Sequence, residues 1–74
     1  MNNEDHQKLL EAKYYQNELE ENQRSVEALI ALLECAGNNH PQYNQLNYLK
    51  NRNQEIESQL ASLNEIINNL KDKI

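Results

Sequence analysis

The sequence predicts an all-α protein, an antiparallel two-helix hairpin with coiled-coil-like packing, and three observations lead to this fold. The chain is rich in Leu, Glu, Gln, Lys and Ala, which are good helix formers. A single group of turn-forming residues, Gly37 to Pro41, interrupts it near the middle. On both sides of this break, apolar residues recur at spacings of three and four, which places them on one side of a helix. We therefore expect one domain, residues 1–74, completed by a partner or by self-association.

The first helix is expected over about residues 4–36. Glu4 and Asp5 lie in its first turn, where the helix dipole favours negative charge. Its apolar stripe is looser than that of the second half, and one stripe position is polar. The stripe consists of Ala12, Tyr15, Leu19, Asn22, Val26, Leu29, Leu33 and Ala36.

A turn over residues 37–40 and a second helix over about 41–73 follow. Gly37 can adopt the left-handed conformation that ends a helix, and Pro41 suits the first turn of a new one. A helix that continued through the turn would give an extended antiparallel dimer instead, which Gly37 and Pro41 disfavour. The second stripe is nearly unbroken and consists of Leu46, Leu49, Asn53, Ile56, Leu60, Leu63, Ile67, Leu70 and Ile74.

Each stripe contains one asparagine, Asn22 in the first half and Asn53 in the second. An asparagine at a seam position of a coiled coil can fix the register or the oligomeric state, at a cost in stability. We therefore interpret Asn22 and Asn53 as register-setting residues. The alternative is that the compositional bias of the chain placed them where the seam is already wet.

More apolar residues gather near the end of the first helix than a two-helix seam can use. A hairpin would leave some of them exposed, and such exposure is typical of an interaction surface. The alternative is a wider seam within the hairpin. We expect partner contacts from Ile30, Leu32, Leu33, Tyr48 and Ile66.

The charge balance argues against two classes of partner. The 74-residue chain has a formal net charge of -5 and lacks the clustered Lys and Arg that nucleic acids and anionic membranes require. No basic segment followed by an apolar run indicates a signal peptide, and no run is long enough to span a bilayer. We therefore expect no nucleic-acid partner and no membrane partner. The single thiol, Cys35, fits a cytoplasmic location.

Residues that could carry catalytic chemistry are sparse and scattered. Cys35 and His40 flank the turn, but two ligands do not make a zinc site. Neighbouring carboxylates such as Glu20 and Glu21 point apart on a helix, and the chain has no phosphate-binding loop and no nucleophile motif. We expect no enzyme activity, and no catalytic residue, metal or cofactor.

The turn and the second helix resemble a known family. The segment Gly37–Tyr43 (GNNHPQY) matches a Gly- or Asn-containing turn with Pro, followed by Gln-Tyr. Glu65–Ile67 and Leu70 match an acidic residue with paired apolar residues near the helix end. These features resemble the small co-chaperones of type III secretion needle subunits, of the YscE/SsaE type. Two departures stand out: Pro41 is one residue closer to Tyr43, and the Ile pair comes about one heptad later.

The resemblance implies a specific function. A protein of this family is a cytoplasmic helical hairpin that pairs with a TPR-like helical chaperone, stabilises it, and helps to keep a needle subunit monomeric. Alone, it self-associates as a homo-oligomer. Tyr43 carries over by position as a further partner-binding residue. An alternative from a different class is a homo-oligomeric coiled-coil assembly module with no chaperone role.

Overall fold

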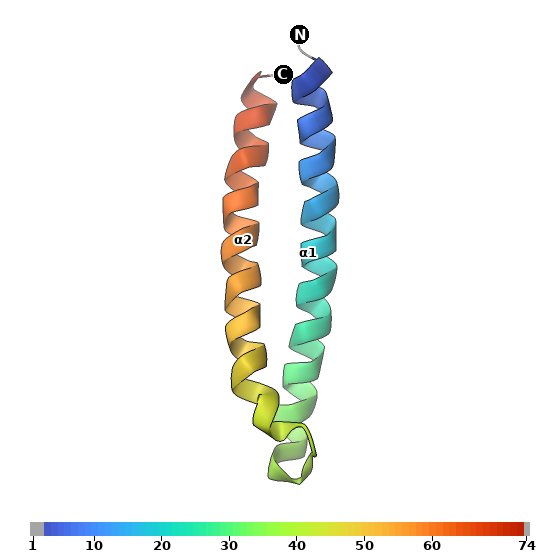
Figure 1. The fold of residues 1–74 in the computed structure, drawn as a ribbon, viewed down its shortest axis with the longest axis vertical. Coiled ribbons are helices and arrows are strands. Elements are labelled where there is room, and N and C mark those ends of the chain that lie inside the picture. The colour runs from blue at the N-terminus through green and yellow to red at the C-terminus, as the bar shows by residue number, and fades with distance from the viewer. Residues whose placement is uncertain (1–2, 74) are drawn as a thin grey trace.

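The chain folds as an all-α helical hairpin, as the sequence predicts. The structure, a computed structural model, describes residues 3–73 in the order α1, η1, η2 and α2, with no strand among them. Figure 1 shows the two long helices side by side, with the connection at one end of a rod. The Cα atoms extend over 57 × 15 × 13 Å. Ile74, expected at the end of the second stripe, lies outside the described residues.

Helix α1 spans Asn3–Ala36, close to the expected range, with Glu4 and Asp5 in its first turn. It ends where Gly37 takes a φ of 66°, in the left-handed region that a side chain disfavours. Gly37 therefore ends the helix by its backbone conformation, and the chain turns away from the axis of α1.

The connection is longer than the expected turn, and the expected start of the second helix at residue 41 is wrong. Two short 3₁₀ helices, η1 (Gly37–Asn39) and η2 (Tyr43–Gln45), separate the long helices. His40 is extended, with φ -82° and ψ 134°, as expected for the residue before a proline. The N–H of Tyr43 donates to His40 O at 3.1 Å, and the N–H of Gln45 donates to Gln42 O at 2.9 Å. These bonds close single three-residue turns, so α-helical geometry begins only afterwards.

Helix α2 spans Leu46–Lys73, with Lys71 and Lys73 in its last turn, where the helix dipole favours cations. Its apolar stripe faces α1 along its length. Within residues 3–73, neither long helix has a stretch long and apolar enough to cross a membrane.

The core of the hairpin is a single row of apolar residues between the helices. Leu33 and Ile56 have no exposed surface, and burial of such a side chain contributes about 1.5–3 kcal/mol. Most of the deeply buried residues belong to α2, so the more regular stripe of the sequence also supplies more of the core. The buried residues are Leu19, Leu33, Leu49, Ile56, Ile67 and Leu70.

The α1 side of the seam is rotated relative to the prediction, and the assignment of Asn22 to the seam is wrong. Asn22 is exposed, and its neighbour Gln23 is half-buried in its place. Tyr15 keeps 52% of its surface exposed, while Gln16 is half-buried. A glutamine can lay its methylene groups along apolar surface and keep its amide in water. The observed α1 seam consists of Leu9, Ala12, Gln16, Leu19, Gln23, Val26, Ile30 and Leu33.

Candidate docking surface

The seam contains polar side chains, and the hairpin supplies hydrogen-bond partners for only some of them. Gln16 Nε2 donates to Asn64 Oδ1 at 2.6 Å, a bond that joins α1 to α2. Asn53 is half-buried, and its Oδ1 is buried without a hydrogen-bond partner among the described residues. An unsatisfied buried acceptor costs about 1–3 kcal/mol. Asn53 therefore weakens the hairpin at the seam position where the sequence predicts a specificity role.

One edge of the seam is charged, and we call it the charged flank. Near the turn, Lys50 Nζ lies 3.3 Å from Glu34 Oε2, which links α2 to α1. All members of this flank are exposed, so they present a hydrated surface. The charged flank consists of Lys13, Glu20, Glu27 and Glu34 from α1 and Lys50, Glu57, Asn64 and Lys71 from α2.

The opposite edge is largely uncharged, and we call it the open flank. Its members follow from the seam by the same seven-residue spacing, with Leu32 and Tyr48 just outside that row. Between residues 15 and 66 Arg52 is its only charged member, and Lys8 and Lys73 continue the same rows towards the chain ends. Glu18 and Glu55 lie along its borders. The open flank consists of Tyr15, Asn22, Leu29 and Leu32 from α1 and Tyr48, Arg52, Gln59 and Ile66 from α2.

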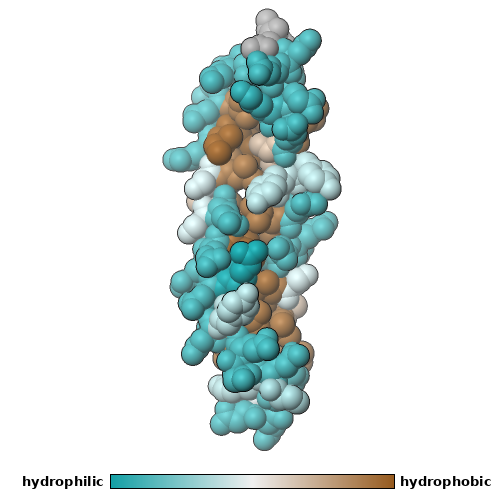
Figure 2. Space-filling view, viewed as in Figure 1, coloured by the Kyte–Doolittle hydropathy of each residue, from teal (hydrophilic) through white to brown (hydrophobic). Residues whose placement is uncertain are grey.

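Towards the ends of the chain, the open flank contains an apolar hollow. Tyr15 of α1 and Ile66 of α2 line it from opposite sides, with Leu63 of the seam between them. Tyr15 and Ile66 remain 52% and 50% exposed. Figure 2 shows apolar residues gathered along the line between the two helices, with hydrophilic residues on both sides. The seam is therefore partly uncovered on this flank.

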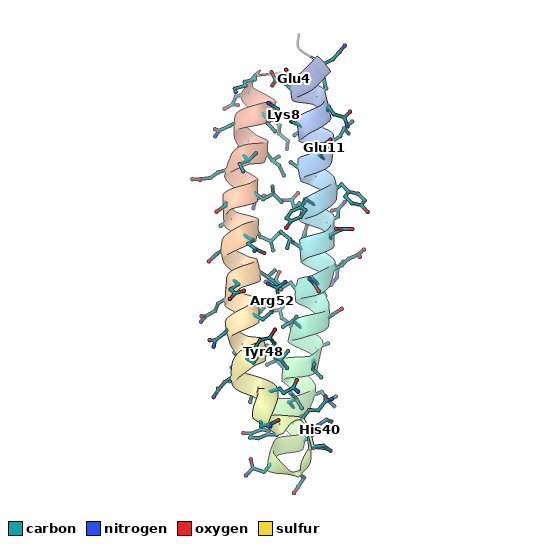
Figure 3. All side chains as sticks on the ribbon, in the orientation of Figure 1. Glu4, Lys8, Glu11, His40, Tyr48 and Arg52 are labelled. Atoms are coloured by element: carbon teal, nitrogen blue, oxygen red, sulfur yellow. The ribbon has the colours of Figure 1, made fainter. Side chains whose placement is uncertain are left out.

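A second apolar group lies on the open flank near the turn. Leu32 and Tyr48 are 52% and 68% exposed, and Leu29 is half-buried beside the seam. Arg52 follows Tyr48 by one helical turn (Figure 3) and lies 3.3 Å from Glu55 Oε2. Two apolar groups thus lie on one flank, separated by the amide residues Asn22 and Gln59.

A further pair of exposed apolar residues lies outside both flanks. Leu10 and Tyr14 are 64% and 67% exposed, and their spacing of four residues places them on one side of α1. A hydrogen bond to Glu18, together with the negative charges of Glu18 and Glu21, raises the pKa of Tyr14. The Tyr14 hydroxyl is thus engaged within α1, and the pair is not continuous with the hollow between the helices.

The predicted partner-binding residues differ in how far the hairpin buries them. Leu33 has no exposed surface, so the prediction that it contacts a partner of the closed hairpin is wrong. Ile30 is half-buried in the seam, and its contact with a partner stays a prediction. Leu33 belongs to the predicted stripe of α1 as well as to the observed seam, whereas the rotation of the seam brings Ile30 inward and moves the row of Tyr15 and Leu29 to its edge. Tyr43 is half-buried in η2. Leu32, Tyr48 and Ile66 are exposed on the open flank.

Sequence reasoning missed Tyr15, Leu29 and Gln59 as members of the open flank. The signal was present, because Tyr15, Asn22 and Leu29 recur every seven residues, as do Arg52, Gln59 and Ile66. Lys8 and Lys73 continue these rows towards the chain ends, but between them Arg52 is the one charged residue, whereas the rows on the other edge are mostly charged. Only the rotation of α1 about its own axis, which the tertiary structure fixes, shows that these two rows lie along the same edge of the seam.

The residues in and beside the connection include a histidine and the single cysteine. The N–H of Gln42 donates to His40 Nδ1 at 3.0 Å, which supports the connection. Cys35 is an exposed free thiol. Among residues 3–73, no three His, Cys, Asp or Glu side chains are grouped in a way that could hold a metal ion.

No protein-family model, curated protein or solved structure matches this chain. The function proposed below therefore rests on the geometry of the hairpin and on the resemblance in its turn and second helix.

Proposed function

We propose that this chain is a non-enzymatic interaction protein that uses its open flank to cover apolar surface on a helical partner. The observation that carries the proposal is the difference between the two flanks. The charged flank is a hydrated surface, whereas the open flank exposes Tyr15, Leu32, Tyr48 and Ile66. Exposed aromatic and aliphatic side chains gathered on one side of a molecule mark protein–protein contact sites.

The shape of the open flank fits a helix. Two antiparallel helices leave a groove between them, and here the groove runs past Leu63 between Tyr15 and Ile66. An amphipathic helix can lay its apolar side into such a groove. A third helix would cover Leu63 from outside, which α1 and α2 alone leave half-buried.

The most specific form of this proposal is a cytoplasmic co-chaperone of the type III secretion kind. It would pair with a TPR-like helical chaperone, stabilise it, and keep a needle subunit monomeric. The support is the resemblance in residues 37–43 and 65–67. Ile66, which belongs to the second of these segments, also lies on the open flank.

Affinity purification of the tagged chain from its native host tests this proposal. We expect wild type and Asn68→Glu to recover a TPR-like helical protein together with a small needle-like subunit. Ile66→Glu should recover neither. Both variants place the same residue on the same exposed stretch of α2, but only Ile66→Glu puts a charge on the open flank. Loss of recovery in both variants, or in neither, would contradict the assignment of this surface.

A second candidate function is a homo-oligomeric coiled-coil assembly module. The chain exposes 5574 Å², whereas compact monomers of its mass, 8.7 kDa, expose about 4,700 Å². A bundle of hairpins would cover this additional surface. In that case purification would recover the chain alone, as one defined oligomer, and melting would depend steeply on concentration.

A further inference from the structure

The outer side of α1 near the chain ends forms an acidic surface that belongs to neither flank. Its members over residues 10–21 are all exposed, and they comprise glutamates, an asparagine, a leucine and a tyrosine, with no Lys or Arg. The two lysines of this half of α1, Lys8 and Lys13, lie in the rows that border the seam. We call this surface the acidic face, and it consists of Leu10, Glu11, Tyr14, Asn17, Glu18 and Glu21.

The apolar part of the acidic face is more exposed than most of the open flank. Leu10 and Tyr14 are 64% and 67% exposed, whereas Tyr15, Leu32 and Ile66 are 52%, 52% and 50% exposed. The hairpin cannot cover this pair, because it lies on the side of α1 that points away from α2. Large apolar side chains rimmed by polar residues are typical of an interaction surface.

The carboxylates of the acidic face have neutral hydrogen-bond partners, which leave the negative charge in place. Gln7 Nε2 donates to Glu11 Oε1 at 3.2 Å, and the Tyr14 hydroxyl donates to Glu18. Within residues 3–73, the ion pairs lie at other positions and engage no carboxylate of this face. The face therefore presents uncompensated negative charge beside its apolar pair.

A polar hollow continues the acidic face towards the turn. Glu18 and Glu21 line it together with Asn22 and Ser25, all from α1. The hydrogen bond to Glu18, followed by the negative charges of Glu18 and Glu21, raises the pKa of Tyr14, as expected beside a region of negative potential. An apolar pair is thus followed, one helical turn later, by a hollow that offers carboxylates to a cation.

We propose that the acidic face binds a cationic amphipathic helix of another protein. Apolar side chains of that helix pack on Leu10 and Tyr14, and the charged ends of its arginine side chains lie in the hollow at Glu18 and Glu21. From Leu10 to Glu21 the face spans about 16 Å along α1, which corresponds to about three turns of the bound helix.

The chemistry of the face favours arginine as the cation. The methylene groups of an arginine side chain cover apolar surface while its guanidinium group stays hydrated. The ring of Tyr14 offers an aromatic surface on which a guanidinium group can stack. The carboxylates of Glu18 and Glu21 accept charge-assisted hydrogen bonds from the same group. The combination of an aromatic ring and carboxylates therefore suits arginine better than a simple point charge.

A second copy of this chain does not fit the acidic face. Lys50 and Lys71 lie on the charged flank and Arg52 lies on the open flank, so the cations of α2 are divided between two edges of the rod. Two copies with a formal net charge of -5 each also repel one another. Nucleic acids and anionic membranes are repelled for the same reason. The partner is therefore a different protein with a basic helix.

This inference does not rest on the proposed function, because the acidic face lies outside the groove of the open flank. Asn22 is the residue that its hollow shares with the open flank. A helix bound between Tyr15 and Ile66 leaves Leu10 and Tyr14 uncovered. Failure of either proposal therefore leaves the other standing.

The first test is an NMR titration of the isotopically labelled chain with a synthetic helical peptide that carries leucine and arginine on one side. A matched peptide carries glutamate in place of arginine. We expect the amide signals of residues 10–25 to shift with the arginine peptide and to stay unchanged with the glutamate peptide. An absence of shifts with the arginine peptide, or shifts confined to the open flank, would overturn the inference.

The second test separates a specific site from attraction to the net charge of α1. The double variant Glu18→Gln with Glu21→Gln removes charge from the acidic face, and Glu20→Gln with Glu27→Gln removes the same charge from the charged flank. All four positions are exposed, and glutamine forms helices about as well as glutamate, so helicity should not change. We expect the affinity for the arginine peptide to fall about tenfold in the first variant and less than about twofold in the second. An equal loss in both would overturn the site.

The third test concerns the apolar pair. Leu10→Gln removes apolar surface without changing the charge and should weaken binding of the arginine peptide about fivefold. Asn17→Gln, on the same exposed face, is the control and should bind as wild type does. Unchanged affinity in Leu10→Gln would overturn the amphipathic character of the proposed partner.

Discussion

The charged flank and the open flank are built from equivalent rows of the same seven-residue pattern, yet they differ in nearly every property. The charged flank is crossed by an ion pair between Lys50 and Glu34. The open flank contains an apolar hollow between Tyr15 and Ile66. Because both rows border the same seam, the hairpin needs neither of them to be apolar for its own folding. The difference therefore supports the proposal that the open flank contacts another chain.

The comparison also separates the residues that stabilise the hairpin from the residues that we propose to bind another chain. An exposed ion pair such as Lys50–Glu34 contributes about 0.2–1 kcal/mol, so the charged flank adds little to stability. The seam supplies the stability through residues such as Leu33 and Ile56. The open flank supplies none of the buried core residues, and it is the surface that we propose for binding.

The largest effect on stability is expected at Ile30, a seam residue that lies close to the open flank. Ile30 lies in the seam although it is only two residues from Leu32. Ile30→Asp places a charge between the helices and should destabilise the hairpin by about 3 kcal/mol or more. Circular dichroism during urea unfolding measures the loss. A variant with native stability would show that Ile30 belongs to a binding surface and that the seam is misassigned.

A smaller effect of opposite sign is expected at Asn53, the polar position between the two flanks. Asn53→Leu removes the unsatisfied Oδ1 and should stabilise the hairpin by about 1–2 kcal/mol, a rise of roughly 5–10 °C in Tm. We also expect a broader distribution of oligomers, because a polar seam residue restricts the register. Gln54→Leu, on the exposed side of the same helix, is the control. An unchanged Tm together with a single species would remove the register-setting role.

A change on the open flank should affect association much more than folding. Leu32→Asp replaces a side chain that is 52% exposed, so the free energy of unfolding should change by no more than about 0.5 kcal/mol. Association should nevertheless be lost, because the charge lies in the apolar group near the turn. Ala31→Asp, the exposed neighbour outside the flank, controls for the helix propensity of aspartate. Loss of helicity in Leu32→Asp alone would identify Leu32 as part of the core.

The smallest effect is expected on the charged flank. A double-mutant cycle of Lys50→Ala and Glu34→Ala should give a coupling energy of about 0.2–1 kcal/mol that falls as salt is added. Urea unfolding at low and high salt measures it. A coupling well above this range would mean that the charged flank helps to hold the helices together, and would weaken the contrast between the flanks.

The sequence by itself determined the helices, the break between them and the seam of α2. These are local properties: helix propensity, the left-handed conformation of Gly37, and a stripe in which every position but Asn53 is apolar. The composition also indicated more apolar surface than two helices can bury. Each of these signals is contained in a few neighbouring residues, so no tertiary contact was needed to find them.

Only the tertiary structure decided which way α1 faces and where α2 begins. The row of Leu19 and Val26 has neighbours of similar character on both sides, Asn22 on one and Gln23 on the other. Packing against α2 selects the side of Gln23 and Ile30, because the rotation of one helix is fixed by the shape of the other. That rotation turns Tyr15 outward, places it in the lining of the same hollow as Ile66, and so creates the difference between the flanks on which the proposed function depends.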